Sequence, residues 1–316
     1  MDRKPRTGRP VARLVVISLA FLLVVGLPRS GLAQTTTGIW TSAAELSRLP
    51  TSGKAWDALL AAARAPVVDP NVSDQDDPDN VRVLARALVF ARTGVESYRQ
   101  EVIAACRAVV GTENGGRTLA LGRELLAYVI AAELVKLPAD QNASFRSWLD
   151  TVRRATLDGR TLISTHEGRP NNWGTHAGAS RMAVALYLGD RADLERAARV
   201  FHGWLGDRSS YTGFHFGELD WQADPARPVG VNRAGSTLGG RSVDGVLPDD
   251  QRRSGGFIWP PPRENYVWGA LQGAVPGVGG AKLTRLATPR MEKAASRTAS
   301  ICCCLRVEID EATGSG

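Results

Sequence analysis

Hydrophobic residues recur at intervals of three and four through most of the first two thirds of the chain, which is the spacing of amphipathic helices. Trp56, Leu59 and Leu60 show this spacing, and strict alternation of apolar and polar residues is nearly absent before Gly206. Short loops separate the helical segments, a pattern typical of antiparallel helix hairpins. The predicted helices cover 54–65, 81–92, 95–110, 117–137, a segment that opens at Pro138, 171–188 and 190–205.

The pattern changes after Gly206, because residues 206–262 are rich in Gly, Pro, Asp and Arg and contain no long periodic run. A loop of this length in a compact domain is typically functional. Helical spacing resumes at Glu264 and is expected to end near Val275, where a proline and three glycines follow within five residues. We interpret 276–316 as an atypical tail, either disordered or, as we favour, produced by a shift of reading frame that leaves the domain incomplete.

The first 33 residues have the features of a secretory signal peptide. Basic residues precede an apolar run from Leu14 to Leu27. The small residues Gly31 and Ala33 then precede an expected cleavage site before Gln34. The run is shorter than the roughly 20 residues that a membrane span requires. We therefore expect a secreted or periplasmic protein with no membrane attachment after cleavage. The predicted divisions are a signal peptide at 1–33, a helical domain at 34–275 and the tail at 276–316.

The positive net charge of the chain lies at its two ends. Residues 1–33 carry a net charge of +5 and residues 276–316 carry +2, so the whole-chain value of +7 leaves residues 34–275 neutral. A neutral body gives no compositional reason to expect binding of nucleic acid, and any anion site must be local.

Cysteine usage predicts neither a disulfide framework nor a zinc site. Cys106 is the one cysteine between residues 34 and 275, and the other three are consecutive at 302–304 without any CxxC spacing. Adjacent cysteines rarely meet disulfide geometry, and no His or Cys spacing is that of a metal site. Val102, Ile103 and Val109 share helical spacing with Cys106, which predicts a buried thiol.

The richest chemistry lies at the start of the 171–188 helix, in the run from Asn171 to His176. Asn172 and His176 are four residues apart and share one helix face. An amide that can hydrogen-bond a carboxylate, one turn from a group that can exchange a proton, suits proton abstraction next to a carboxylate. The Asn pair could instead be a helix N-cap, a position that asparagine favours. His176 could instead be a buried histidine of the core.

This segment resembles the alginate lyase family, whose active-site helix carries an Asn-Asn-His signature. The likeness covers most of 40–275 and includes the later run 247–266. It implies an all-α fold, an (α/α) toroid of antiparallel helix hairpins with a long loop over one end. It also implies a lyase that cleaves an alginate-like, uronate-containing anionic polysaccharide by β-elimination without a cofactor. The chain departs from the signature at Trp173, which stands where the family has its histidine.

The resemblance assigns catalytic roles that fit the chemistry of β-elimination. Asn172, with Arg252 or Arg253, would neutralise the carboxylate and so stabilise the enolate-like intermediate. His176 and Tyr266 would be the base and the acid, in either order. The arginines could instead be solvated loop charges, and Tyr266 a packing aromatic. The predicted substrate contacts are Asn171, Trp173, His215 and Trp259.

Two other functions are compatible with the same residues. One is a non-catalytic or inactivated glycan-binding protein of the same fold. The other is an inverting glycoside hydrolase that uses a pair of carboxyl groups as acid and base. The candidate carboxyl groups for that pair are Glu218, Asp220, Asp249 and Asp250.

Overall fold

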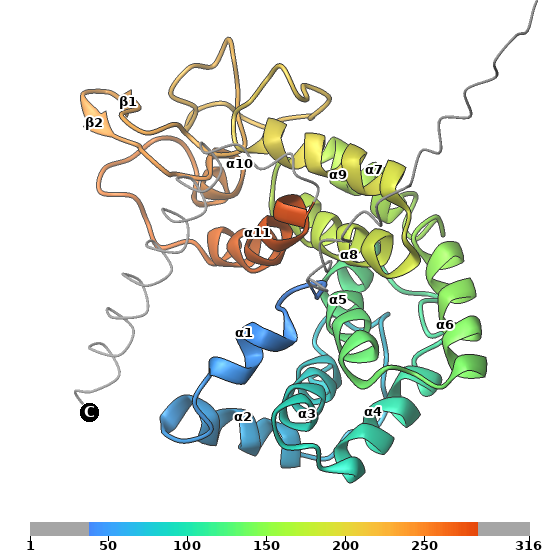
Figure 1. Cartoon of the computed structure of the whole chain (residues 1–316). Coiled ribbons are helices and arrows are strands. Elements are labelled where there is room, and N and C mark those ends of the chain that lie inside the picture. The colour runs from blue at the N-terminus through green and yellow to red at the C-terminus, as the bar shows by residue number, and fades with distance from the viewer. Residues whose placement is uncertain (1–37, 284–316) are drawn as a thin grey trace, which may run out of the picture. The chain divides into compact units, whose positions relative to one another are not determined.

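Helices dominate the computed structural model, which describes residues 38–283 (Figure 1). The predicted helices are present with small shifts at their ends, and three short helices are added. The helices are α1 (Ala43–Arg48), α2 (Lys54–Arg64), α3 (Asp79–Thr93), α4 (Glu96–Ala108), α5 (Thr118–Val135), α6 (Ala139–Val152), α7 (Leu162–Gly168), α8 (Asn172–Leu188), α9 (Arg191–Trp204), α10 (Pro248–Gln251) and α11 (Asn265–Leu283).

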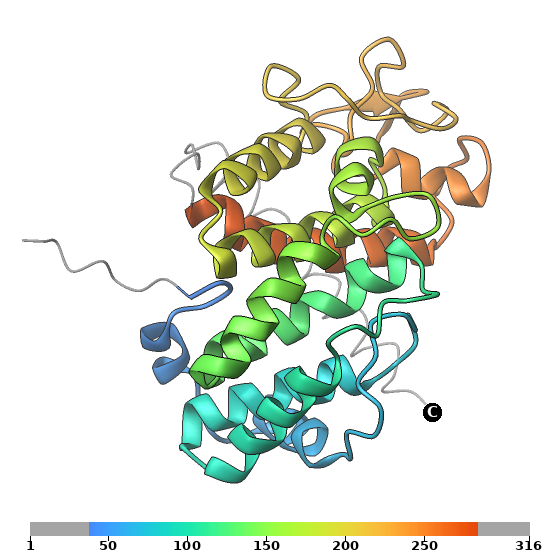
Figure 2. The same cartoon turned by 90° about the vertical axis from the view of Figure 1, so that its right-hand side faces the viewer.

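The long helices form an inner and an outer series. In the inner series α3 packs on α5, α5 on α8 and α8 on α11, so that each inner helix contacts the next although other elements lie between them in the sequence. Gly122 of α5 lies against Ala177 of α8, and Ser180 donates a 2.8 Å hydrogen bond to the Gly122 carbonyl. Helices α4, α6 and α9 return the chain outside this series (Figures 1 and 2). This arrangement confirms the all-α class and the hairpin architecture of an (α/α) toroid.

Inner and outer helices differ in sequence because they differ in surroundings. Helices α5 and α8 are buried on nearly all sides, as expected of helices that are apolar around their circumference. The largest apolar cluster contains Tyr128 of α5, Phe145 and Leu149 of α6, and Cys106 of α4. Cys106 is buried as predicted, and this burial raises the pKa of its thiol to about 12. The thiol is therefore part of the core packing.

The segment between α9 and α11 contains more structure than its composition indicates. Strands β1 (Thr237–Leu238) and β2 (Arg241–Ser242) form an antiparallel pair, and a 3-10 turn η1 (Arg252–Ser254) follows α10. Trp221 is fully buried and donates its indole N–H to the Gly255 carbonyl at 2.9 Å. In both views the segment gathers at one end of the helical array (Figures 1 and 2). It therefore has the position that was expected of the long loop.

The expected end of the last helix at Val275 is wrong, because α11 continues through Pro276 to Leu283. Proline fixes φ near the helical value and removes one backbone donor, so a helix can continue past it at a cost. The predicted signal peptide and residues 284–316 of the predicted tail lie outside the described residues. Within 38–283, no helix combines the length and the apolar character that a membrane span requires.

Candidate active site

The first turn of α8 is held in place by two consecutive aspartates of α10. Asn171 is the N-cap of α8: its side-chain oxygen accepts the Trp173 N–H at 3.2 Å, and its amide nitrogen donates to Asp249 at 2.8 Å. The backbone N–H of Asn172 donates to the carboxyl of Asp250 at 2.9 Å. Helix N-termini present N–H groups that lack partners within the helix, so buried acceptors are needed there. The loop segment thereby fixes where α8 begins.

The side chain of Asn171 bonds to protein groups, whereas a contact with substrate was predicted. Its side chain is 1% exposed, and both of its polar atoms have protein partners. Capping uses the oxygen, Asp249 uses the nitrogen, and the residue is buried away from solvent. The residue positions α8, which is the alternative that the sequence had left open.

The two candidate arginines have different surroundings. Arg252 donates to Asp249 at 3.0 Å and pairs with Glu218, so its guanidinium is occupied within the loop segment. Arg253 is exposed, and its guanidinium carbon lies 4.6 Å from the ring centroid of Tyr266. No carboxylate within residues 38–283 forms an ion pair with Arg253. Of the two, Arg253 is therefore the guanidinium available to a substrate carboxylate.

Asn172 and His176 share a helix face, as predicted, but this face is packed against α11. A Cβ placed on Gly269 of α11 would lie 3.6 Å from the Asn172 Cβ, and Gly273 packs against Thr175 and His176. The His176 ring is buried and hydrogen-bonds the Gly269 backbone, and burial lowers the pKa of His176 to about 4. The imidazole is thus neutral and lies in a helix interface, as the alternative of a core histidine implies.

Tyr266 lies in the first turn of α11, at the same end of the inner helices as Asn172. It is 42% exposed, and it precedes Gly269 by three residues, or about one helical turn. The Asn172 side chain forms no hydrogen bond within residues 38–283, and its amide oxygen is buried without a partner. Asn172 thus contacts α11 one turn beyond Tyr266, and Arg253 lies over the Tyr266 ring.

The other predicted substrate contacts lie around this group at different places. Trp173 is half-buried with two guanidinium carbons, of Arg117 and Arg169, at 5.0 and 5.5 Å from its ring. His215 is exposed, and its backbone N–H donates to the Gly168 carbonyl at 2.9 Å. Trp259 is 42% exposed on the loop before α11, and no described hydrogen bond, ion pair or ring contact joins it to the start of α8.

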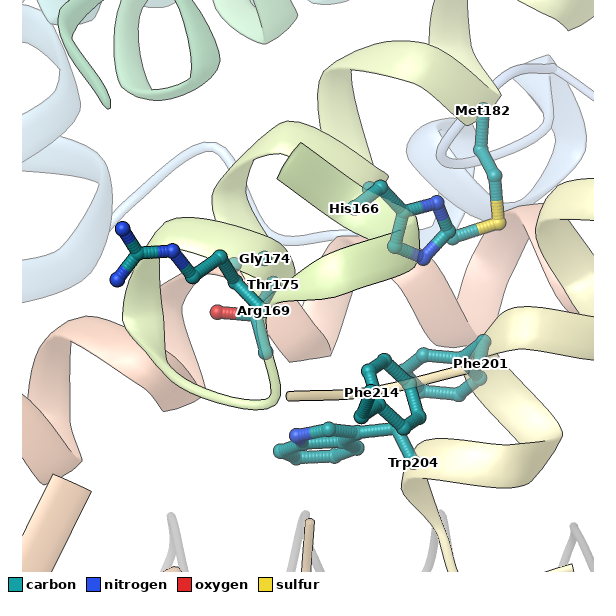
Figure 3. Close-up of a pocket in the computed structure, with 10 residues that line it drawn as sticks. His166, Arg169, Gly174, Thr175, Met182, Phe201, Trp204 and Phe214 are labelled. Atoms are coloured by element: carbon teal, nitrogen blue, oxygen red, sulfur yellow. The ribbon is translucent and has the colours of Figure 1, made fainter. Parts of the chain in front are cut away.

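A small cavity between α7, α8 and α9 is separate from this group of residues. It measures about 10 Å³, and its lining includes His166, Phe201 and Trp204 (Figure 3). A space of this size holds about one water and no sugar ring. Burial and the nearby Arg181 hold the pKa of His166 well below its usual value, so this ring is neutral. Within residues 38–283 no three His, Cys, Asp or Glu side chains are grouped to hold a metal ion.

The sequence placed Asp249 and Asp250 among four candidate carboxyl groups of a hydrolase and gave no sign of their part in holding α8. Burial raises the pKa of Asp250 to about 8, and the adjacent Asp249 acts in the same direction. The Asn172 N–H, Arg253 and Arg252 oppose this change. One carboxyl oxygen of Asp250 is buried without a partner, so the protonated form is the favoured one in the fold.

The raised pKa of Asp250 predicts a pH-dependent stability. The unfolded side chain ionises near pH 4, whereas the folded one ionises near pH 8, so the folded protein keeps a proton that the unfolded chain loses. This contribution to the free energy of unfolding is full below about pH 4 and decreases as the pH rises through about 8. Asp250→Asn keeps an oxygen for the Asn172 N–H and cannot ionise. Its melting temperature should fall less between pH 5 and pH 8 than that of the wild type.

Thermal unfolding from pH 5 to pH 9 measures this difference. Asp220→Asn, at an exposed carboxyl of the same segment, is the matched control and should follow the wild type. Equal slopes for Asp250→Asn and the wild type would contradict the assignment of a proton to Asp250. Burial also raises the pKa of Glu124 to about 8, so Glu124 adds a pH dependence of the same sign. The slope of melting temperature against pH in Asp250→Asn is therefore expected to be shallower than in the wild type without reaching zero.

The fold and the site together define a class of protein: an all-α array of parallel inner helices that gathers an amide, a guanidinium and a phenol at one end. Residues 80–218 match the family model described as alginate lyase, and this match includes Asn171 to His176. Over these residues the chain is similar to the alginate lyase family, a family of polysaccharide lyases. The match ends before Arg253 and Tyr266. Searches of curated proteins and of solved structures find no match to this chain.

Proposed function

We propose that the protein is a secreted polysaccharide lyase that cleaves a uronate-containing, alginate-like glycan by β-elimination at the site formed by Asn172, Arg253 and Tyr266. The observation that carries the proposal is the position of Tyr266. It lies one turn from the glycine that packs on Asn172, and the guanidinium of Arg253, which forms no ion pair within residues 38–283, lies over its ring. An amide, a cation and a proton-transfer group are the three types that the reaction needs.

The reaction removes the proton at C5 of a uronate and expels the glycosidic oxygen at C4. The C5 proton is weakly acidic, and its loss places negative charge on the adjacent carboxylate. The Asn172 N–H groups and the Arg253 guanidinium would stabilise this charge. The C5–H electron pair forms a C4=C5 double bond as the C4–O bond breaks, and the departing oxygen takes a proton. The product is an unsaturated uronate and a shortened chain with a free hydroxyl.

Tyr266 is the favoured proton-transfer group in this scheme. Its side chain is partly exposed at the end of α11, whereas His176 is buried and its ring is bonded to the Gly269 backbone. A base must reach the proton that it abstracts within hydrogen-bond distance of the substrate. We therefore assign proton removal, and return of a proton to the departing oxygen, to Tyr266. His176 would hold α11 beside α8 and so keep Tyr266 next to Asn172.

The bonding of Asp249 and Asp250 argues against these two residues as the acid and base of a hydrolase. Asp249 accepts hydrogen bonds from Asn171, Gly217 and Arg252, and Asp250 accepts the Asn172 N–H. These carboxyl groups hold the start of α8 and the loop segment together. An inverting hydrolase requires two carboxyl groups free to contact a water and a glycosidic oxygen.

An elimination assay across a panel of polyuronates tests the proposal. The C4=C5 double bond of the product is conjugated with the carboxylate and absorbs in the ultraviolet. Appearance of this absorbance together with new reducing ends is the expected result. New reducing ends without the absorbance would show that the protein is a hydrolase and not a lyase. Polymer binding without absorbance and without new reducing ends would show a non-catalytic glycan-binding protein.

A further inference from the structure

A cavity in the loop segment between α9 and α11 is lined by three arginines. It measures about 100 Å³, and its lining includes Arg208, Arg227 and Arg233. The loop segment that contains it gathers at one end of the helical array (Figure 1). A water needs about 10–15 Å³ of such a space, so the cavity has room for several waters or for one small anion. None of its lining residues belongs to the candidate active site.

Two buried amide side chains hold the walls of this cavity in place. Gln222 is buried, donates to the Val229 carbonyl at 2.9 Å and accepts the Val229 N–H at 3.0 Å. Asn232 is buried, donates to the Trp221 carbonyl at 2.9 Å and accepts the Ala223 N–H at 3.2 Å. Each amide thus joins two stretches of the loop segment through both of its polar atoms. Walls fixed in this way keep the arginines together before a ligand arrives, which lowers the entropic cost of binding.

The three arginines have donor groups that the described part of the protein does not use. Arg208 donates to the Pro228 carbonyl at 3.0 Å, and Arg233 donates to the Gly206 carbonyl. Arg227 is exposed, and its side chain forms no hydrogen bond within residues 38–283. None of the three forms an ion pair with a carboxylate of these residues. Because a guanidinium carries five N–H donors, most of the donors of this group are available to a ligand.

The carboxyl groups near the cavity leave an excess of positive charge in its lining. Asp224 lines the cavity, accepts the backbone N–H of Ala226 at 3.1 Å and forms no ion pair within residues 38–283. Asp207 and Asp244 are close in sequence but lie outside the lining. Asp207 accepts the hydroxyls of two serines, and Asp244 accepts a backbone N–H. Three guanidinium groups and one carboxylate therefore line the cavity, which gives the lining a net charge of +2.

We propose that this cavity binds a tetrahedral oxyanion that carries two negative charges. The class includes inorganic sulfate, inorganic phosphate and the phosphate monoester of a sugar. A net charge of +2 in the lining is matched by a dianion and only half matched by a carboxylate. Guanidinium groups bind such oxyanions through paired N–H donors, and the hydroxyl of Ser236 in the lining is a further donor. The site is separate from the proposed lyase chemistry and does not depend on it.

Calorimetry with sodium sulfate and with sodium phosphate measures the affinity of the full chain. The titrations are made at constant ionic strength and about pH 8, where phosphate monoesters carry two charges. Arg227→Gln is the principal variant, because the exposed wild-type side chain makes no hydrogen bond within the described fold. It should raise Kd about tenfold, since it removes charge-assisted hydrogen bonds to the anion. Its melting temperature without added anion should equal that of the wild type.

Asp224→Asn should change the affinity in the opposite direction. Asparagine keeps an oxygen for the Ala226 N–H, so the turn is retained, and the charge that repels an anion is removed. Kd for sulfate should therefore fall several-fold. Arg241→Gln is the matched control for charge, at an exposed residue of β2 outside the cavity lining, and should bind as the wild type does. Because the anion binds the folded protein, sulfate should raise the melting temperature of the wild type more than that of Arg227→Gln.

Two results would overturn the site: the same sulfate Kd in Arg227→Gln and the wild type, or equal effects of Arg227→Gln and Arg241→Gln. Acetate that binds as tightly as sulfate would overturn the assignment to a dianion.

Glucose 6-phosphate distinguishes the two sources of the ligand. Binding of this ester that depends on Arg227 would support a site for phosphorylated sugars. Arginine-dependent binding of the inorganic ions without binding of the ester would support a site for the free ion. These measurements require no turnover, so an inactive protein that shows arginine-dependent binding would refute the lyase and support the cavity site. An active lyase without such binding would do the reverse.

Discussion

Tyr266→Phe is expected to lower kcat at least about 10²-fold, because it removes the hydroxyl to which we assign proton transfer. The change leaves the aromatic ring in place, so the contact of the Arg253 guanidinium with the ring face is kept. The backbone N–H of residue 266, which donates to Glu264 at 3.0 Å, is unaffected as well. The loss should therefore fall on kcat, with KM and the melting temperature close to their wild-type values.

The measurement is the initial rate of ultraviolet absorbance on the best polyuronate of the panel. Tyr98→Phe is a matched control, since Tyr98 packs beside α2 and α3 in a separate apolar cluster. It removes one hydroxyl and should leave the rate unchanged. A kcat for Tyr266→Phe within a few fold of the wild type, in a protein that melts normally, would show that the hydroxyl takes no part in the reaction.

The helices could be predicted from the sequence because their determinants are local. Apolar spacing, the acidic start of α3 and the glycines after α3 and α8 mark elements within their own residues. The continuation of α11 through Pro276 could not be predicted in this way. A proline ends a helix in most local contexts, and whether the chain stays helical beyond it depends on the surroundings in the fold.

The candidate site was predicted in part, and the missing parts concern contacts between distant segments. The sequence singled out Asn172 and Tyr266, and a shared helix face for Asn172 and His176 follows from the period of the helix. It gave no sign that this face would be covered by α11. It also could not separate Arg252 from Arg253, because adjacent residues differ only in the partners that the fold supplies. Asp249 accepts a hydrogen bond from Arg252, whereas the guanidinium of Arg253 lies over the ring of Tyr266.

The distance between Asn172 and Tyr266 depends on two glycines that let α8 fit between its neighbours. A Cβ on Gly122 of α5 would lie 3.0 Å from the backbone nitrogen of Ala177. On the other side, a Cβ on Gly273 of α11 would lie 2.5 Å from the carbonyl carbon of Thr175 and would overlap the backbone nitrogen of His176. Backbone therefore meets backbone on both sides of one turn of α8. That turn cannot move away from α11 without moving into α5.

Gly273→Ala is consequently expected to be strongly destabilising, although alanine is the better helix former. The added methyl group must displace α11, which should cost about 3 kcal/mol, or ~10 °C in melting temperature for a domain of this size. Displacement of α11 also moves Tyr266 from Asn172, so the rate of elimination should fall in the fraction that remains folded. Gly269→Ala is the matched control on the same helix. Its Cβ would lie 3.6 Å from the Asn172 Cβ, an ordinary contact, so its melting temperature should equal or exceed that of the wild type. Similar melting temperatures for the two variants would show that α11 is not held at this separation by the packing of Gly273.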